Sequence, residues 1–213
     1  KKVYNSDIKG FNVSKPHKRA IIELLDETDE VVSSIGAVNT VIKKNNKLSG
    51  TNVDWIGIQD SLKEKTKIQN KNVTVLGAGG AARAAIYACK KNNASNITVL
   101  NRTVSKAKKL SDEFKCKCGS ISEFPELRSD IVIQATSAGM NEPEGVEIVP
   151  KKYLNADMVV MEVIYSPLKT RIIRDAKEKG AKIITGERML LNQGFACFEL
   201  WTGKKAPKEA MEK

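Results

Sequence analysis

The stretch Val73-Thr74-Val75-Leu76-Gly77-Ala78-Gly79-Gly80-Ala81-Ala82-Arg83 decides the fold. Its first four residues predict a buried strand, and the alanine-rich residues after the glycines predict a helix. Between them lies the G-x-G-x-x-G/A pattern of dinucleotide-binding βαβ units, in the required order of strand, tight turn and helix. The free N–H groups at the start of such a helix favour phosphate. A flexible surface loop is the alternative, and the flanking strand and helix argue against it.

Short β-branched runs then alternate with amphipathic segments through the second half of the chain. This alternation predicts a parallel sheet with helices on both faces, that is, an α/β Rossmann-type domain. Further strands are expected at Ile97–Leu100, Asp130–Gln134, Met158–Val163 and Lys182–Thr185, with a weak one in Lys115–Gly119. Helices are expected at Ala81–Lys91, Ser105–Phe114 and Thr170–Lys179.

The first third of the chain has a different pattern. We expect a strand at Phe11–Val13, a helix from Pro16 through Ile21–Leu25, and a hairpin formed by Ala37–Lys43 and Lys47–Thr51. A helix over Asp54–Leu62 then leads into a polar connection, 63–71, where we place a domain boundary. The last long helix, Met189–Trp201, is expected to pack back onto the first part. The predicted domains are 1–65 completed by 188–213, and 66–187. The first of these has little core of its own, so we expect an incomplete α/β domain.

Composition excludes several classes of protein. The chain has 36 Lys and Arg against 25 Asp and Glu, a formal charge of +11. A nucleic-acid surface needs clustered charge with stacking aromatics. Aromatics are only 5% here and the lysines are scattered, so we expect a solvated surface that helps attract anionic ligands and no nucleic-acid partner. No apolar run approaches the ~20 residues that cross a bilayer, so no membrane partner is expected either.

The four cysteines do not suggest a disulfide framework or a metal site. Cys116 and Cys118 lack the second Cys pair or His cluster that would complete a tetrahedral site. Cys89 and Cys197 fall on the apolar faces of predicted helices, where free cysteine behaves as a small hydrophobe. These features indicate a reducing, cytoplasmic location. A homodimer is the oligomeric state that we consider.

The residues after the second strand indicate which dinucleotide binds. Sites that prefer NAD carry Asp or Glu about 20 residues beyond the glycines, where the carboxylate accepts hydrogen bonds from the ribose. This chain has Asn101-Arg102-Thr103 there, with Lys106 one turn further. Two cations and neutral polar groups suit the 2′-phosphate of NADP. The alternative is an exposed basic helix start.

Three polar residues of the first part could carry chemistry. Lys18 follows a strand at the start of a predicted helix, a position that fits an acid/base lysine but also a solvated one. Asp54 stands at a strand-to-helix junction and could be a helix N-cap. Asn39 lies within a β-branched run, where its amide needs hydrogen-bond partners or a hydroxylated ligand. His17 is the only histidine, and we treat it as structural or incidental.

Several motifs occur together and in order across essentially the whole chain. They are Gly10-Phe11-Asn12-Val13-Ser14-Lys15-Pro16-His17-Lys18, Ile35-Gly36-Ala37-Val38-Asn39-Thr40, Gly50-Thr51-Asn52-Val53-Asp54-Trp55, Gly77–Ala81 with Asn101–Lys106, Ala135-Thr136-Ser137-Ala138-Gly139-Met140, Tyr165-Ser166-Pro167-Leu168, and Gly186-Glu187-Arg188-Met189-Leu190 with Gln193. This set resembles the shikimate dehydrogenase family, whose patterns include G-x-N-V-T-x-P-x-K, GAVNT, G-x-N-T-D, GAGGA and NRTxxK/R.

The resemblance implies a two-domain enzyme with its active site in the cleft between the domains. Family members transfer a hydride between NADP and C3 of shikimate or 3-dehydroshikimate. Lys18 and Asp54 would then form the acid/base pair. The implied substrate contacts are Ser14, Lys18, Asn39, Asp54, Tyr165 and Gln193. The implied cofactor contacts are Gly77, Ala78, Gly79, Gly80, Ala81, Asn101, Arg102, Thr103 and Lys106, with Val163, Gly186 and Met189 at the nicotinamide end.

This sequence departs from the family pattern at four positions. Ser14 and Val53 stand where the family has Thr, Gln134 where it has Asn, and Glu162 where Asp is more usual. The family's N-terminal strand–helix unit, whose Ser-x-Ser motif holds the substrate carboxylate, has no equivalent before Gly10, so we expect a segment to precede Lys1. A quinate/shikimate dehydrogenase paralogue and a non-catalytic NADP-binding remnant are the alternatives.

Overall fold

A small mixed sheet is formed by the first part of the chain in the computed structural model, which describes residues 6–140 and 145–213. Its strands are β1 (Gly10–Asn12), β2 (Glu27–Thr28), β3 (Thr40–Lys44) and β4 (Lys47–Thr51), in the order β1-β3-β4-β2. β3 pairs antiparallel with β1 and β4, whereas β2 runs parallel to β4. The strand expected at Phe11–Val13 therefore finds its neighbour in the predicted hairpin.

The second sheet is fully parallel, as the sequence predicts. Its strands are β5 (Asn72–Leu76), β6 (Asn96–Leu100), β7 (Lys117–Gly119), β8 (Ile131–Gln134), β9 (Val159–Glu162) and β10 (Lys182–Ile184), in the order β10-β9-β8-β5-β6-β7. This is the Rossmann order, with the chain reversing direction across the sheet between β5 and β8. Ligands of such sheets bind at the carboxyl ends of the strands beside this switch point. The predicted α/β class is confirmed.

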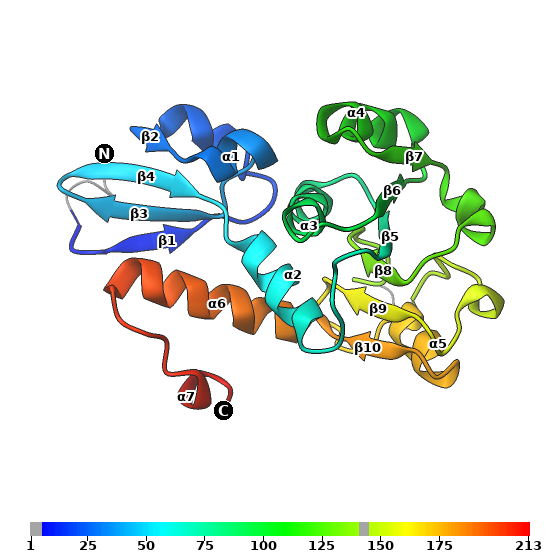
Figure 1. Cartoon of the computed structure of the whole chain (residues 1–213). Helices are drawn as coiled ribbons and strands as arrows, with labels where there is room; N and C mark the ends of the chain where they lie inside the picture. Colours follow the sequence, from blue (N-terminus) through cyan, green and yellow to red (C-terminus); the bar gives the residue numbers. More distant parts are fainter. Residues whose placement is uncertain (1–5, 141–144) are drawn as a thin grey trace.

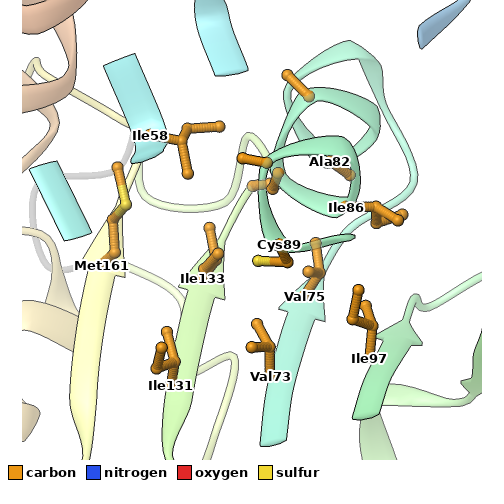
Figure 2. Packing of buried hydrophobic residues seen from close by; sticks show 14 of the residues in the cluster. Ile58, Val73, Val75, Ala82, Ile86, Cys89, Ile97, Ile131, Ile133 and Met161 are labelled. Atoms are coloured by element: carbon orange, nitrogen blue, oxygen red, sulfur yellow. The ribbon is translucent and has the colours of Figure 1, made fainter. Parts of the chain in front are cut away.

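Helices cover both faces of the parallel sheet. Figure 2 shows Ala82, Ile86 and Cys89 of α3 (Gly80–Lys91) packed over the apolar side chains of β5, β6 and β8, with Ile58 of α2 (Asp54–Lys63) beside them. α4 (Val104–Phe114) lies on the same side, whereas α5 (Arg171–Glu178) packs on the opposite face against Val132 and Val160. Among the described residues, no helix is long and apolar enough to cross a membrane.

The long helix α6 (Gly186–Thr202) joins the two parts. It leaves the end of β10, lies along α2 and continues under the first sheet (Figure 1). There Trp201 donates its indole N–H to the Val41 carbonyl at 3.0 Å. α2 and α6 approach closely because Gly57 has no side chain: a Cβ there would lie 2.7 Å from the Met189 carbonyl oxygen and 3.0 Å from Cβ of Gln193.

The sequence missed several short elements of the chain. These are β2, α1 (Glu30–Ile35), α7 (Lys208–Met211) and the 3-10 helices Ile121–Glu126 and Lys151–Tyr153. The prediction that a helix begins at Pro16 is wrong. Residues 15–19 form turns, and a 3-10 helix, Ala20–Leu24, follows them. The Lys18 carbonyl accepts the Val38 N–H at 2.7 Å and so is diverted from a helical bond to Ile22, whose N–H goes to Arg19 instead.

Two of the departures from the family pattern organise the loops at the carboxyl edge of the parallel sheet. Gln134, the last residue of β8, accepts the Thr136 N–H at 2.8 Å and donates to the Ala138 carbonyl at 3.2 Å. Glu162, the last residue of β9, accepts the Ile164 N–H at 3.0 Å and the Thr170 hydroxyl at 2.8 Å. Both side chains are fully buried. Each therefore folds the loop that follows its own strand.

Replacement of Gly57 by alanine tests the close contact of α2 and α6. The new methyl group must displace the backbone of α6, so we expect Gly57→Ala to lower the free energy of unfolding by about 1–3 kcal/mol. Gly194→Ala on α6 is the matched control, because its Cβ would make ordinary contact with Met211 at 3.8 Å. Urea denaturation of both variants measures the effect. Equal stability of Gly57→Ala and Gly194→Ala would contradict the packing described here.

Burial raises the pKa of Glu162 from 4.5 to about 7, against the effect of its hydrogen-bond donors. Between these two values the folded protein retains a proton that the unfolded chain has released. The free energy of unfolding should therefore fall as the pH rises through this window, and the contribution of Glu162 should level off above about 7. Glu162→Gln is neutral throughout and still accepts the Ile164 N–H. We expect its stability relative to the wild type to increase by on the order of 3 kcal/mol from pH 4.5 to 7 in urea titrations. A difference in stability between Glu162→Gln and the wild type that does not vary with pH would contradict the raised pKa of Glu162.

Candidate functional site

An ion pair between Lys18 and Asp54 forms the centre of the candidate site. Lys18 Nζ lies 2.5 Å from Asp54 Oδ2, and the two side chains are 24% and 7% exposed. Lys18 comes from the turn after β1, and Asp54 is the first residue of α2. The structure thus brings together the two residues expected to form the acid/base pair, with the carboxylate buried and the amine open to solvent on one side.

Asp54 does not act as a helix cap. Its own N–H is bound by Oδ1 of Asn52 at 3.0 Å, and Asn52 is held in turn through a hydrogen bond from Nδ2 to the Ala37 carbonyl at 3.0 Å. Asn52, buried and without a predicted role, therefore satisfies the start of α2. This leaves both oxygens of the Asp54 carboxylate free to bind side chains from outside the helix.

Asn39 supplies the second contact to that carboxylate. It is 2% exposed and lies immediately before β3, not inside it. Its Nδ2 donates to Asp54 Oδ1 at 2.7 Å, while its Oδ1 accepts the Val53 N–H at 2.7 Å and the Thr40 hydroxyl at 2.9 Å. The amide is thereby oriented by donors on one side and an acceptor on the other. The prediction that Asn39 needs hydrogen-bond partners is confirmed within the protein itself.

The glycine turn lies beside this cluster. Gly77 has a φ of 114°, which L side chains rarely adopt, and a Cβ there would lie 2.9 Å from the backbone of Ala135. A Cβ on Gly79 would meet no atom within 4 Å, and one on Gly80 would lie 3.9 Å from Cδ of Lys18. The start of α3 therefore presents open backbone that fits a pyrophosphate, next to the side chain of Lys18. Ala78 and Ala81 pack against the core below.

Exposed basic side chains surround the end of β6. Arg102, Thr103 and Lys106 are exposed, and Asn101 donates its Nδ2 to the Thr103 carbonyl at 2.9 Å. In the part of the chain that the structure describes, neither Arg102 nor Lys106 forms an ion pair. Their charges are available to an anion that extends from the glycine turn.

The residues predicted for the nicotinamide end converge where α6 begins. A Cβ on Gly186 would lie 2.2 Å from the Ile164 carbonyl oxygen, so only glycine lets α6 start against the loop after β9. Met189 is buried one turn further along α6, and Val163 is partly buried against the same core. Tyr165 of this loop is 55% exposed.

The remaining predicted substrate residues lie on different elements. Ser14 is exposed on the turn after β1, four residues before Lys18, and His17 is exposed on the same turn. Gln193 is half-buried on α6 and donates its Nε2 to Sγ of Cys197 at 3.4 Å. Cys197 in turn contacts Thr40, the neighbour of Asn39. Gln193 is therefore connected to the ion pair through side chains, whereas Ser14 and Tyr165 are presented at the surface.

Sequence reasoning missed the roles of Asn52, Thr40 and Cys197. Cys197 is the clearest case, since it was assigned to an apolar helix face. Cys89 does lie in the apolar core, and burial raises the pKa of its thiol to about 12. Cys197 instead lies among the polar atoms of Asn12, Thr40 and Gln193. All four cysteines are free, and no group of three His, Cys, Asp or Glu in residues 6–140 and 145–213 could hold a metal.

Comparisons with known proteins agree in pointing to one family. Family models described as "Shikimate / quinate 5-dehydrogenase", "Shikimate 5'-dehydrogenase C-terminal domain" and "Shikimate dehydrogenase substrate binding domain" match residues 60–160, 186–213 and 1–41. Shikimate dehydrogenase (NADP(+)) of Pyrococcus abyssi is 42% identical over 97% of this chain and 77% of its own length.

Solved structures give the same result. The crystal structure of shikimate dehydrogenase from Aquifex aeolicus matches with a TM-score of 0.93 and 39% identity, over 99% of this chain and 78% of that one. Shikimate 5-dehydrogenase from Thermus thermophilus, crystallised with NADP(H) and shikimate, matches with a TM-score of 0.91 and 33% identity, over 100% of this chain and 79% of that one. By sequence and by fold, the chain belongs to the shikimate dehydrogenase family.

Proposed function

We propose that this protein is an NADP-dependent oxidoreductase that interconverts shikimate and 3-dehydroshikimate. The observation that carries the proposal is the ion pair of Lys18 and Asp54 beside the open glycine turn, with 2.5 Å between Nζ and Oδ2. A protein that only bound a dinucleotide would have no need of a solvent-accessible amine held by a buried carboxylate at this place. The names of the relatives supply the substrate and the preference for NADP.

Oxidation of the C3 alcohol removes a proton from its oxygen and a hydride from its carbon, leaving a ketone. Bound NADP⁺ supplies the hydride acceptor. In this direction the neutral amine of Lys18 takes the proton from the hydroxyl, and in the reverse direction its ammonium form returns a proton to the ketone oxygen. Asp54 orients Nζ through Oδ2 and stabilises the ammonium form that results. Asn39 keeps the other oxygen of the carboxylate in place.

We assign the remaining contacts by position. The backbone of Gly77, Ala78, Gly79, Gly80 and Ala81 would hold the pyrophosphate, and Asn101, Arg102, Thr103 and Lys106 the adenosine end with its 2′-phosphate. Val163, Gly186 and Met189 would face the nicotinamide. Ser14, Asn39, Tyr165 and Gln193 would bind the hydroxyl and carboxylate groups of the substrate. These roles rest on the family motifs and on the placement of these residues around the switch point of the parallel sheet.

Two domains would enclose this site. We propose a substrate domain of residues 1–65 completed by 188–213, and a cofactor domain of residues 66–187. The separate sheets support this division, and the continuous helix α6 crosses it at Gly186–Met189. The cytoplasmic location and the homodimer stay predictions from the sequence.

Replacement of Lys18 tests the assigned proton transfer. Lys18→Met keeps the length of the side chain but cannot exchange a proton, so we expect kcat for shikimate oxidation to fall by about 10²–10⁴-fold, with little change in NADP⁺ affinity. The measurement is NADP⁺ reduction by the full-length protein with shikimate and, in a second series, with quinate. Lys15→Met, an exposed lysine of the same turn, is the matched control. No turnover of either substrate by the wild type would contradict the proposal that the protein is an enzyme. Faster turnover of quinate than of shikimate would favour the quinate/shikimate dehydrogenase paralogue. A fully active Lys18→Met would refute only the role of Lys18 in proton transfer.

Replacement of Arg102 tests the dinucleotide preference. We expect Arg102→Ala to weaken NADP⁺ binding about ten- to a hundredfold, because a charge-assisted contact to the 2′-phosphate is lost, and to leave NAD⁺ binding unchanged. Isothermal titration of both cofactors measures the ratio. Lys109→Ala, an exposed lysine further along α4, serves as the control. Equal affinities of the wild type for NADP⁺ and NAD⁺ would count against the assignment.

A further inference from the structure

Cys197 joins α6 to the strands of the first sheet through polar contacts. Its Sγ lies 3.4 Å from Oγ1 of Thr40, 3.2 Å from Nδ2 of Asn12 and 3.4 Å from Nε2 of Gln193. Cys197 is 2% exposed and Thr40 is fully buried. A buried thiol in such surroundings differs from Cys89, which lies among apolar side chains.

Counting hydrogens fixes the direction of the bonds that Thr40 forms with Asn39 and Cys197. The amide of Gln193 donates to Sγ of Cys197, and the amide of Asn12 shares its two hydrogens among that sulfur, Oγ1 of Thr40 at 3.3 Å and the Asn39 backbone carbonyl at 3.2 Å. The Thr40 hydroxyl has a single hydrogen. At 2.9 Å from Asn39 Oδ1, which has no hydrogen to give, that hydroxyl must be the donor.

The contact between Thr40 and Cys197 then has one possible direction. Because the hydrogen of Thr40 is already used, the Cys197 S–H must donate to Oγ1 of Thr40. The result is a directed chain: thiol to hydroxyl, hydroxyl to the Asn39 carbonyl, and the Asn39 NH₂ to the carboxylate of Asp54. Bonds arranged head to tail polarise one another and are stronger together than singly.

The chain ends on the group that holds Lys18. Asn39 Nδ2 faces Asp54 only in one of the two orientations of the amide, and a flipped amide would place Oδ1 against the carboxylate oxygen. The Thr40 hydroxyl and the Val53 N–H both favour the observed orientation. Without the hydroxyl, Oδ1 of Asn39 keeps one donor instead of two, and the thiol of Cys197 loses its acceptor. Asp54 would then be held less firmly in the geometry that its contact with Lys18 requires.

We propose that Thr40 is a positioning residue for the catalytic pair and that the thiol of Cys197 completes its hydrogen bonding from α6. The inference rests on the proposed function, because it concerns how the side chains of Asn39 and Asp54 are held in position beside the Lys18 amine. It also gives Gln193 a connection to the same chain through Sγ of Cys197. The contacts from α6 and from the start of β3 are thus parts of one hydrogen-bonded unit.

Thr40→Val removes the hydroxyl but keeps the shape and the β-branching of the side chain. We expect kcat for shikimate oxidation to fall about tenfold, which is the scale of one lost buried hydrogen bond. KM for shikimate should change less than kcat, and the Kd for NADP⁺ should not change. Thr40→Ser restores the donor and should recover most of kcat. Thr74→Val is the matched control, since Thr74 is a buried threonine of β5 whose hydroxyl bonds the Ser129 hydroxyl, away from the site. It should lower stability without lowering kcat.

The infrared S–H stretching band provides a readout that does not depend on turnover. The band of Cys197 is identified by its loss in Cys197→Ala, and we expect it to move to higher frequency in Thr40→Val but not in Thr74→Val. An active wild type with unchanged kcat in Thr40→Val would overturn the positioning role and leave the proposed function intact. An S–H band that does not move would overturn the assigned direction of the chain. An inactive wild type would overturn the proposed function and the positioning role together.

Discussion

The contact between Lys18 and Asp54 depends on segments that are far apart in the sequence, and the rest of the site is arranged around it. Lys18 is fixed through its carbonyl by Val38, and Asp54 is fixed through its N–H by Asn52. Both anchors hold backbone groups of Lys18 and Asp54, so the two charged side chains stay free to pair with each other. A carboxylate that is 7% exposed requires such a neighbour, because an unpaired buried charge would be strongly destabilising. The same arrangement keeps the amine accessible for proton transfer.

The two sheets meet this pair from different directions. The glycine turn lies at the switch point of the parallel sheet, where the end of β5 leads into α3 (Figure 1). The smaller sheet positions Lys18 through the turn after β1 and Asp54 through the end of β4. Helix α6 spans both, and Gly57 and Gly186 allow it to lie against α2 and against the loop after β9. The buried side chains of Gln134 and Glu162, which stand where the family has Asn and Asp, shape the neighbouring loops through their hydrogen bonds.

Much of this could be predicted because local sequence determines it. The glycine turn, the alternation of strands and helices, and the hairpin were found within a few residues of their positions, since period and turn chemistry are local signals. The helix from Pro16 failed because Val38 takes the Lys18 carbonyl, a bond that no local pattern reveals. Asp54 looked like a cap because the capping role of Asn52 depends on its bond to Ala37. The roles of Thr40 and Cys197 were missed for the same reason, because these two residues contact each other across 157 residues of the chain.

A double-mutant cycle on the ion pair tests the central claim most directly. Lys18→Met, Asp54→Asn and the combined variant would be compared with the wild type in kcat/KM for shikimate oxidation. If the two residues act as one unit, the double variant should lose about as much activity as the more damaging single variant, so the losses should be strongly non-additive. Additive losses, with each residue contributing the same factor whether or not the other is present, would contradict the account.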